Sequence, residues 1–467
     1  MLFKNLARYP DIGSNSYLLD IGKTRIVLDA GTHPKHTGRD TLPRFEEIEP
    51  DSVDAIFVSH PHLDHIGGLP VLMQQQISAA VAMTEATRES GAALLHNSVN
   101  VMQSQKEELN EPSYPLYSHR RVNEYERLWF AREVGEVFSV GSVDRVECEF
   151  FPAGHVQGAV GIRIEGADHR VFYTGDVHFE DQTLTRAARF PTEGIDTLII
   201  ETTRGGYERD PSYTREREKA RLGESIRKTL ERGGSVLVPV FAFGKTQEFL
   251  LMLQELRQAG EIPVVPVHIG GLSTRMSQIA DQFADSDERL HSGTRLLEDF
   301  EDLHILPRGH LEPEFHPGRI YALSSGMMSE HTVSNRFARH ILRSELNSLI
   351  FVGYADSETP AGKIIASGQG GRVQMDEKNA HESVIHCEVH RFDFSGHAPR
   401  DQIADYAHSC SPKNVILVHG DPEARNWFLD ELTRRLPESR ILVPKPGEEI
   451  SLSGISDSAL PPASSPA

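Results

Sequence analysis

The chain has 467 residues, of which 38% are hydrophobic and 25% charged, a composition typical of a folded globular protein and not of a disordered or fibrous one. This length exceeds what one ordinary core needs, so we expect two domains or one domain with a large insertion. The formal net charge of −20 argues against a protein that coats nucleic acid through bulk electrostatics, although bound cations or a local basic groove would still allow a nucleic-acid enzyme.

Membrane and secretion signals are not evident in the sequence. No apolar run approaches the ~20 residues that span a bilayer, and residues 1–13 lack the apolar stretch of a secretory signal. The cysteines Cys148, Cys387 and Cys410 are scattered and odd in number, which predicts neither a disulfide framework nor a Cys-rich metal site. We therefore expect a cytoplasmic protein that does not enter the membrane.

The first part of the chain contains short apolar runs that end in polar residues. Strands are predicted, in chain order, at 16–21, 25–30, 54–60, 170–176 and 196–202. A helical pattern at 67–77 follows the third of these strands. This strand-to-helix order predicts a βα unit of an α/β protein.

The middle of the chain has its own alternation of helices and strands. Helices are predicted at 214–232 and 245–260, and strands at 235–244 and 262–271. Short strands return after 384. The pattern predicts an insertion into a domain whose strands come from both chain ends, with 1–205 and 386–452 as the surrounding domain and 206–385 as the insert. The Pro/Ser/Ala-rich tail, 453–467, is predicted to be disordered.

The strongest chemical signal is the segment 59–65, SHPHLDH. His60 and His62 are two residues apart on an extended segment, so both imidazoles can point to the same side. Asp64 and His65 follow where the chain turns towards a helix, so they face a neighbouring point. Imidazole nitrogen and carboxylate oxygen are ligands that zinc prefers, and this spacing suits two metal ions a few ångströms apart. A His-rich surface turn is the alternative, and four ligand-type residues in six argue against it.

Two metal ions need further ligands, and other predicted strand ends supply candidates. His155 follows a β-rich run, and Asp176 ends another. A carboxylate can bridge two metal ions and a neutral imidazole cannot, so we expect Asp176 to bridge.

These residues resemble known motifs. With Asp29, His155 and Asp176, the HPHLDH segment resembles the motif series of the metallo-β-lactamase superfamily. Glu201, His397 and His419 resemble three further motifs of the β-CASP family of RNA-processing nucleases, which carry a domain inserted between the first and second of these. The resemblance extends to about residue 452. It implies an α/β fold, a metallo-β-lactamase αββα sandwich with an inserted α/β β-CASP domain.

The resemblance also implies roles for individual residues. It implies one zinc ion held by His60, His62, His155 and Asp176. It implies a second zinc ion held by Asp64, His65, Asp176 and His419. His397 would protonate the leaving oxygen with Glu201 orienting it, Asp64 would be catalytic as well as a ligand, and Asp29 would orient the ligands.

A turn in the insert resembles the phosphate-contacting loop of this family. It contains Ser325 and Gly326, and a purely structural turn is the alternative. Gly244-Lys245-Thr246 does not form a nucleotide-binding P-loop, because Pro239 stands where that motif needs glycine.

The sequence thus predicts a zinc-dependent ribonuclease that hydrolyses phosphodiester bonds in RNA processing or decay. By the resemblance, His419 and Glu201 favour RNA over DNA as the substrate. Internal cleavage of single-stranded RNA is the leading hypothesis, with 5′-exonucleolytic trimming left open. The alternatives are a DNA nuclease of the same family, a hydrolase of a small thioester, ester or lactone on the same fold, and a non-enzymatic RNA-binding protein. The oligomeric state is open, and a homodimer is one candidate.

Overall fold

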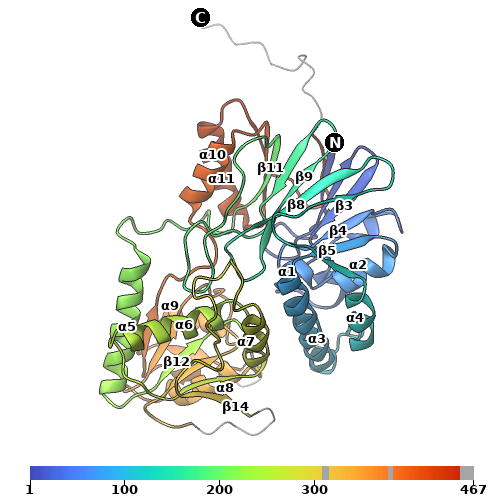
Figure 1. The fold of residues 1–467 in the computed structure, drawn as a ribbon. Helices are drawn as coiled ribbons and strands as arrows, with labels where there is room; N and C mark the ends of the chain where they lie inside the picture. The colour runs from blue at the N-terminus through green and yellow to red at the C-terminus, as the bar shows by residue number, and fades with distance from the viewer. Residues whose placement is uncertain (308–314, 377–381, 453–467) are drawn as a thin grey trace, which may run out of the picture.

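A computed structural model of the chain describes residues 1–307, 315–376 and 382–452. The predicted disordered tail therefore lies outside the described residues. Figure 1 shows two lobes: the blue N-terminal and red C-terminal parts share one, and the green-to-orange middle of the chain forms the other. Among the residues that the structure describes, no helix is both long and apolar enough to cross a membrane.

Strands from both chain ends build two seven-stranded sheets in the first lobe. The first sheet has the order β22 (Glu449–Ser451), β1 (Leu2–Asn5), β2 (Tyr17–Ile21), β3 (Thr24–Leu28), β4 (Ala55–Phe57), β5 (Ala80–Met83) and β6 (Trp129–Ala131). The second has the order β21 (Arg440–Leu442), β20 (Asn414–Val418), β11 (Thr197–Glu201), β10 (Arg170–Tyr173), β9 (Val160–Glu165), β8 (Val146–Pro152) and β7 (Val137–Val140). Because β22 pairs with β1 and β20 with β11, the two chain ends form one domain.

An apolar core lies between these sheets, and helices cover their outer faces. The inner core takes Phe57 of β4 and Phe150 of β8 from opposite sheets. The first sheet is accompanied by α1 (Leu63–Ile66), α2 (Leu69–Gln75), α3 (Glu85–Glu108), α4 (His119–Glu126) and the 3₁₀ turns η1 (Gly38–Thr41) and η2 (Phe45–Glu47). The second is covered by α10 (Arg400–Cys410) and α11 (Pro422–Arg435). The predicted αββα sandwich is confirmed.

The insert is a second α/β unit, as predicted. Its parallel sheet has the order β14 (Leu303–Leu306), β13 (Val267–Gly270), β15 (Ile320–Leu323), β12 (Val236–Pro239), β16 (Ser348–Phe351) and β19 (Glu388–Arg391). One face packs on α5 (Arg215–Glu231), α6 (Lys245–Gln258) and α7 (Leu272–Gln282), and the other on α8 (Val333–Ile341) and α9 (Pro360–Ser367). A separate hairpin joins β17 (Arg372–Gln374) and β18 (Glu382–Val384). The parallel strands are buried on both faces, which explains their continuous apolar sequences.

One strand lies in a different sheet from the one expected. The sequence pattern ends the insert at 385, but β19 pairs in parallel with β16, with Glu388 opposite Ser348 and Arg391 opposite Phe351. This strand therefore belongs to the sheet of the insert. Hydrophobic periodicity reports that a strand is buried and not which sheet it joins, so the sequence pattern could not place it.

The two lobes pack directly against each other. Helix α3 of the sandwich contacts α7 of the insert, and a small apolar cluster between them includes Leu94, Val156 and Phe243. The Phe243 ring, in the loop between β12 and α6, lies 6.2 Å from the His62 ring. The packing thus brings a loop of the insert next to the predicted metal ligands.

Candidate metal centre

The predicted ligands lie just beyond the ends of strands. Asp176 follows β10, Glu201 ends β11 and His419 follows β20. These three strands are neighbours and run parallel, so their carboxyl ends meet at one edge of the sheet. Asp29, after β3, and His60, after β4, come from the facing sheet, where those strands are also parallel neighbours. The fold therefore brings together residues that are hundreds of positions apart.

The structure groups four of these side chains around one point. They are His60, His62, His155 and Asp176, each offering one ligand atom, with all four atoms within 4.8 Å of one another. Asp176 Oδ2 lies 3.4 Å from His60 Nε2 and 3.7 Å from His155 Nε2. His155 donates its Nδ1 hydrogen to the Gly396 carbonyl at 2.8 Å, so its Nε2 is a lone-pair donor when the ring is neutral.

A second group lies on the other side of Asp176. Asp64, His65 and His419 form it, again with ligand atoms within 4.8 Å. Asp176 Oδ1 lies 3.4 Å from His65 Nε2 and 3.0 Å from His419 Nδ1. The two carboxylate oxygens of Asp176 thus face different groups, which is the arrangement a bridging ligand requires.

The chemistry of these atoms fits metal ions. His60 Nε2 and Asp176 Oδ1 are buried and have no hydrogen-bond partner. Asp176 Oδ1 lies close to His419 Nδ1, but the two atoms are not aligned for a hydrogen bond. His155 Nε2 and His62 Nδ1 face each other at 3.2 Å. Buried polar atoms that leave lone pairs unsatisfied are costly unless something binds them. The residues of these two groups are therefore candidate metal ligands.

The electrostatics of the two groups differ. Burial lowers the pKa of His62 to about 4 and holds the pKa values of His60 and His155 well below the usual range, so these imidazoles are neutral at pH 7. Burial opposes protonation of His419 too, but the Asp176 and Asp64 carboxylates outweigh it and raise its pKa well above the usual range. A metal ion at the second group must therefore displace a proton from His419, and binding there weakens first as the pH falls.

Asp29 supports the ligands from beneath. Its carboxylate accepts hydrogen bonds from Ser59 N (2.7 Å), Ser59 Oγ (2.8 Å), Tyr173 Oη (2.6 Å) and His65 Nδ1 (2.7 Å). The bond to His65 leaves Nε2 of that ring facing the metal-binding group. Sequence reasoning identified Asp29 but missed Ser59 and Tyr173. Ser59 stands inside the SHPHLDH segment, whereas the contact of Tyr173 crosses between the sheets.

His397 and Glu201 form a pair at the edge of the cluster. His397 Nδ1 lies 3.1 Å from both carboxylate oxygens of Glu201, which also accepts a hydrogen bond from Val177 N at 2.7 Å. Glu201 is buried, whereas His397 is partly exposed. His397 Nδ1 is also 3.9 Å from Asp176 Oδ2, so the pair adjoins the metal ligands.

The segment that carries His397 is held by residues that sequence reasoning did not single out for this. Asp393 is ion-paired with Arg204 at 2.6 Å, and its carbonyl accepts a hydrogen bond from Tyr213 Oη at 2.8 Å. Lys245 Nζ donates to the Phe394 carbonyl at 2.5 Å. These contacts link the insert to the loop that presents His397.

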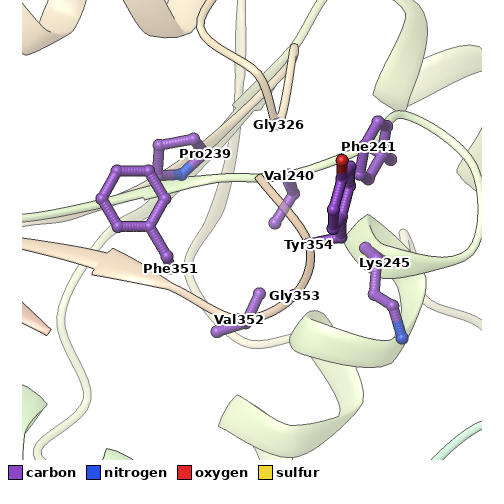
Figure 2. A pocket seen from close by; sticks show the side chains of 9 residues that line it. All are labelled: Pro239, Val240, Phe241, Lys245, Gly326, Phe351, Val352, Gly353 and Tyr354. Carbon is purple, nitrogen blue, oxygen red and sulfur yellow. The ribbon is translucent and has the colours of Figure 1, made fainter. Parts of the chain in front are cut away.

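The two predicted phosphate-contacting residues lie in the insert. Ser325 and Gly326 follow β15, and Gly326 lines a pocket at the carboxyl end of the sheet (Figure 2). The Ser325 carbonyl accepts a hydrogen bond from Ser334 Oγ at 2.7 Å, so the turn is tied to the start of α8. Contact with a phosphate group stays a prediction.

Comparisons with known proteins agree with this geometry. Three family models match the chain: the metallo-beta-lactamase superfamily over residues 9–223, the Beta-Casp domain over 246–364 and the Zn-dependent metallo-hydrolase RNA specificity domain over 383–444. A crystal structure of a protein of unknown function from Enterococcus faecalis has a TM-score of 0.56 at 13% identity, covering 96% of this chain and 99% of that one. This likeness concerns the fold alone.

Several curated proteins are similar in sequence. Cleavage and polyadenylation specificity factor subunit 3-I of Arabidopsis thaliana is 26% identical, covering 95% of this chain and 62% of that protein. Transcription termination factor FttA of Methanothermobacter thermautotrophicus is 28% identical, covering 88% of this chain and 66% of that protein. Endoribonuclease YSH1 of Saccharomyces cerevisiae is 28% identical, covering 90% of this chain and 54% of that protein. The chain thus spans between about half and two thirds of the length of these relatives.

The sandwich, its insert and the clustered histidines and carboxylates define the class of metal-dependent hydrolases with this architecture. The chain belongs to the metallo-β-lactamase superfamily and, within it, to the proteins that carry a Beta-Casp domain.

The Asp29 network predicts a measurable loss of stability. In Asp29→Asn, the new amide NH₂ group would face the hydrogen-bond donors of Ser59, Tyr173 and His65 and could not accept from them. The free energy of unfolding should therefore fall by about 2–4 kcal/mol. Urea unfolding with a chelator present measures this without any contribution from bound metal. Asp405→Asn, which removes a carboxylate that is 70% exposed, is the control and should change little. Equal stability of the two variants would contradict a structural role for Asp29.

Proposed function

We propose that the protein is a two-zinc endoribonuclease that cleaves single-stranded RNA at internal phosphodiester bonds in RNA processing or decay. The observation that carries the proposal is the His397–Glu201 pair beside the metal-binding groups. A proton donor at this place suits a leaving ribose oxygen, which needs a proton, and a small thioester would leave as a thiolate without one. The names of the relatives, which include an endoribonuclease and a cleavage factor, and the RNA specificity domain match over 383–444, support RNA as the substrate.

Zinc is the proposed metal because the donors are imidazoles and carboxylates at spacings that two closely placed ions require. One ion would be held by His60, His62, His155 and Asp176. The other would be held by Asp64, His65, Asp176 and His419. Zinc bound there supplies Lewis acidity, which polarises the phosphate and lowers the pKa of the attacking water.

The protein's own residues supply orientation and a proton. Glu201 holds His397 through Nδ1, so the proton for the leaving oxygen is carried on Nε2. Asp29 fixes His65 through its Nδ1 and acts as a positioning residue. Asp64 lies 3.3 Å from His419 Nε2, and we assign it to both metal binding and catalysis.

We place the enzyme in the cytoplasm. Cys148, Cys387 and Cys410 are all free and buried, and a chain with three unpaired thiols suits a reducing compartment. Burial raises the pKa of the Cys410 thiol to about 11, so this thiol stays protonated and unreactive at neutral pH.

Loss of the proton donor should slow cleavage strongly. We expect metallated parent protein to cut 5′-labelled single-stranded RNA internally, and His397→Ala to reduce the rate about 10²- to 10⁴-fold with bound metal unchanged. Glu201→Gln should cost about 10- to 100-fold, because the ring keeps its proton donor but loses its orientation. His408→Ala, on the exposed side of α10, is the matched control.

The same assay separates the alternative functions. Cleavage of matching single-stranded DNA in preference to RNA would favour a DNA nuclease. No cleavage of either polymer by fully metallated protein would contradict the proposal, and turnover of a small thioester or lactone would then identify the other hydrolase class. RNA binding with empty metal-binding groups would indicate a non-enzymatic protein.

Metal analysis tests the ligand assignment. Purified parent protein should contain two zinc ions per chain, and His419→Ala should keep about one, because the first group of ligands is intact. Asp176→Asn should lower the zinc occupancy of both groups of ligands, since the Asp176 carboxylate serves both. Elemental analysis after dialysis gives the ratio, with His408→Ala expected to retain two. Unchanged zinc in both ligand variants would refute the assignment.

A further inference from the structure

The pocket in Figure 2 lies on the insert at the carboxyl end of its parallel sheet. Its lining comes from the segments that follow β12, β15 and β16, which are adjacent strands. Crevices at the carboxyl ends of open parallel sheets are the usual ligand sites of α/β domains. The metal-binding groups belong to the other lobe, and of the residues that line this pocket only Gly326 has a role predicted above, in a phosphate contact.

Two aromatic side chains in this pocket are unusually exposed. Phe241 is 38% exposed and Tyr354 is 58% exposed, and both line the pocket. Figure 2 shows them grouped with Lys245 on one side, opposite Pro239 and Phe351. The stem of Lys245 lies beside the rings, and its nitrogen points away from them. Exposed aromatic ring faces are the elements on which single-stranded nucleic acid stacks its bases, so a base would lie against these faces and not inside the pocket.

Both rings are held in position before any ligand binds. A Cβ added at Gly326 would lie 3.2 Å from the Phe241 ring, so the ring packs closely against this turn. Tyr354 Oη donates to Asp356 Oδ2 at 3.3 Å, and Asp356 is ion-paired with Lys35 of the sandwich lobe at 2.8 Å. The pocket therefore borders the other lobe, and its rings need little reordering when a ligand binds.

The pocket connects to the metal centre on two sides. Phe243 lies two residues after Phe241 in the same loop, and its ring is 6.2 Å from that of His62. Lys245 donates one hydrogen to the carbonyl of Phe394, three residues before His397. An ammonium group has three hydrogens, so Lys245 can also contact a phosphate of a strand that passes from the pocket to the metal centre.

We propose that Phe241 and Tyr354 form a nucleobase subsite, in which the rings stack on one base of the RNA strand and Lys245 contacts an adjacent phosphate. This inference rests on the proposed function. Because every base has a π-face, the subsite binds a nucleotide at a fixed distance from the cleaved bond with little preference for sequence. It would also require that nucleotide to be unpaired, since a base in a duplex is already stacked on both faces.

Binding of fluorescent single-stranded RNA, measured by anisotropy, tests the subsite. Phe241→Ala and Tyr354→Ala should each weaken binding about 5- to 150-fold, the range for loss of one stacked base. Tyr354→Phe keeps the ring and should bind within about two-fold of the parent. Phe130→Ala removes a ring that is 55% exposed on β6, away from the pocket, and should have no effect.

An abasic scan separates stacking from a structural effect. RNAs that lack one base at successive positions should show one position at which the parent loses affinity. That loss should be smaller in Phe241→Ala and should disappear in the double variant Phe241→Ala/Tyr354→Ala, because the base and the two rings form the same contact. Phe241→Leu keeps the apolar bulk on Gly326 without an aromatic face, and should behave as Phe241→Ala does. It serves as the second variant if the alanine protein unfolds.

The outcomes distinguish this inference from the proposed function. Parent-like affinity of Phe241→Ala and Phe241→Leu, or an abasic loss of unchanged size in them, would overturn the subsite while internal RNA cleavage by the parent still stands. Absence of cleavage with the coupled abasic effect intact would overturn the nuclease and support the subsite. Absence of any RNA binding would overturn both.

Discussion

The site depends on one buried carboxylate, that of Asp176, which is only 3% exposed and faces imidazoles on both of its sides. A buried charge is tolerated only when partners compensate it, so the segments that supply those partners must converge around β10. His419 is 355 residues from Asp64 and reaches it because β20 pairs beside β11 at the carboxyl edge of the sheet. The two packed sheets of the sandwich hold these side chains in place. The favourable free energy of packing the core offsets the cost of burying polar and charged groups close together.

The insert enters and leaves the sandwich at the hydrogen-bonded pair of Glu201 and His397. The chain departs after Glu201 and returns just before His397, so the two partners of one hydrogen bond flank the whole insert. Asp393, held by Arg204 and Tyr213, ties the departing and returning segments together. A shift of the insert would therefore move His397 relative to the metal ligands. This topology therefore couples the position of the insert to the position of His397.

The sequence indicates candidate ligands because Asp176 and His419 follow apolar strands, and because a surface turn has no need of four ligand-type residues within the six positions from His60 to His65. Their binding of metal stays a prediction. Sequence reasoning could not predict contacts that depend on how the sheets face each other, such as the bond from Tyr173 to Asp29. It placed β19 in the sandwich because periodicity does not specify a pairing partner. Nothing in the local sequence shows that the Lys245 side chain reaches the carbonyl of Phe394, 149 residues away.

The acidic charge of the chain, −20 overall, bears on how it would hold RNA. A chain of this net charge gains little affinity from bulk lysine–phosphate attraction, and affinity of that kind would fall steeply with salt. Stacking on Phe241 and Tyr354 does not rely on charge, and metal ions at the cluster add positive charge only where the cleaved phosphate must lie. Such a site attracts a strand at one point instead of along its length. An acidic exterior then disfavours non-specific binding of nucleic acid, while the few local contacts still position a single unpaired segment for cleavage.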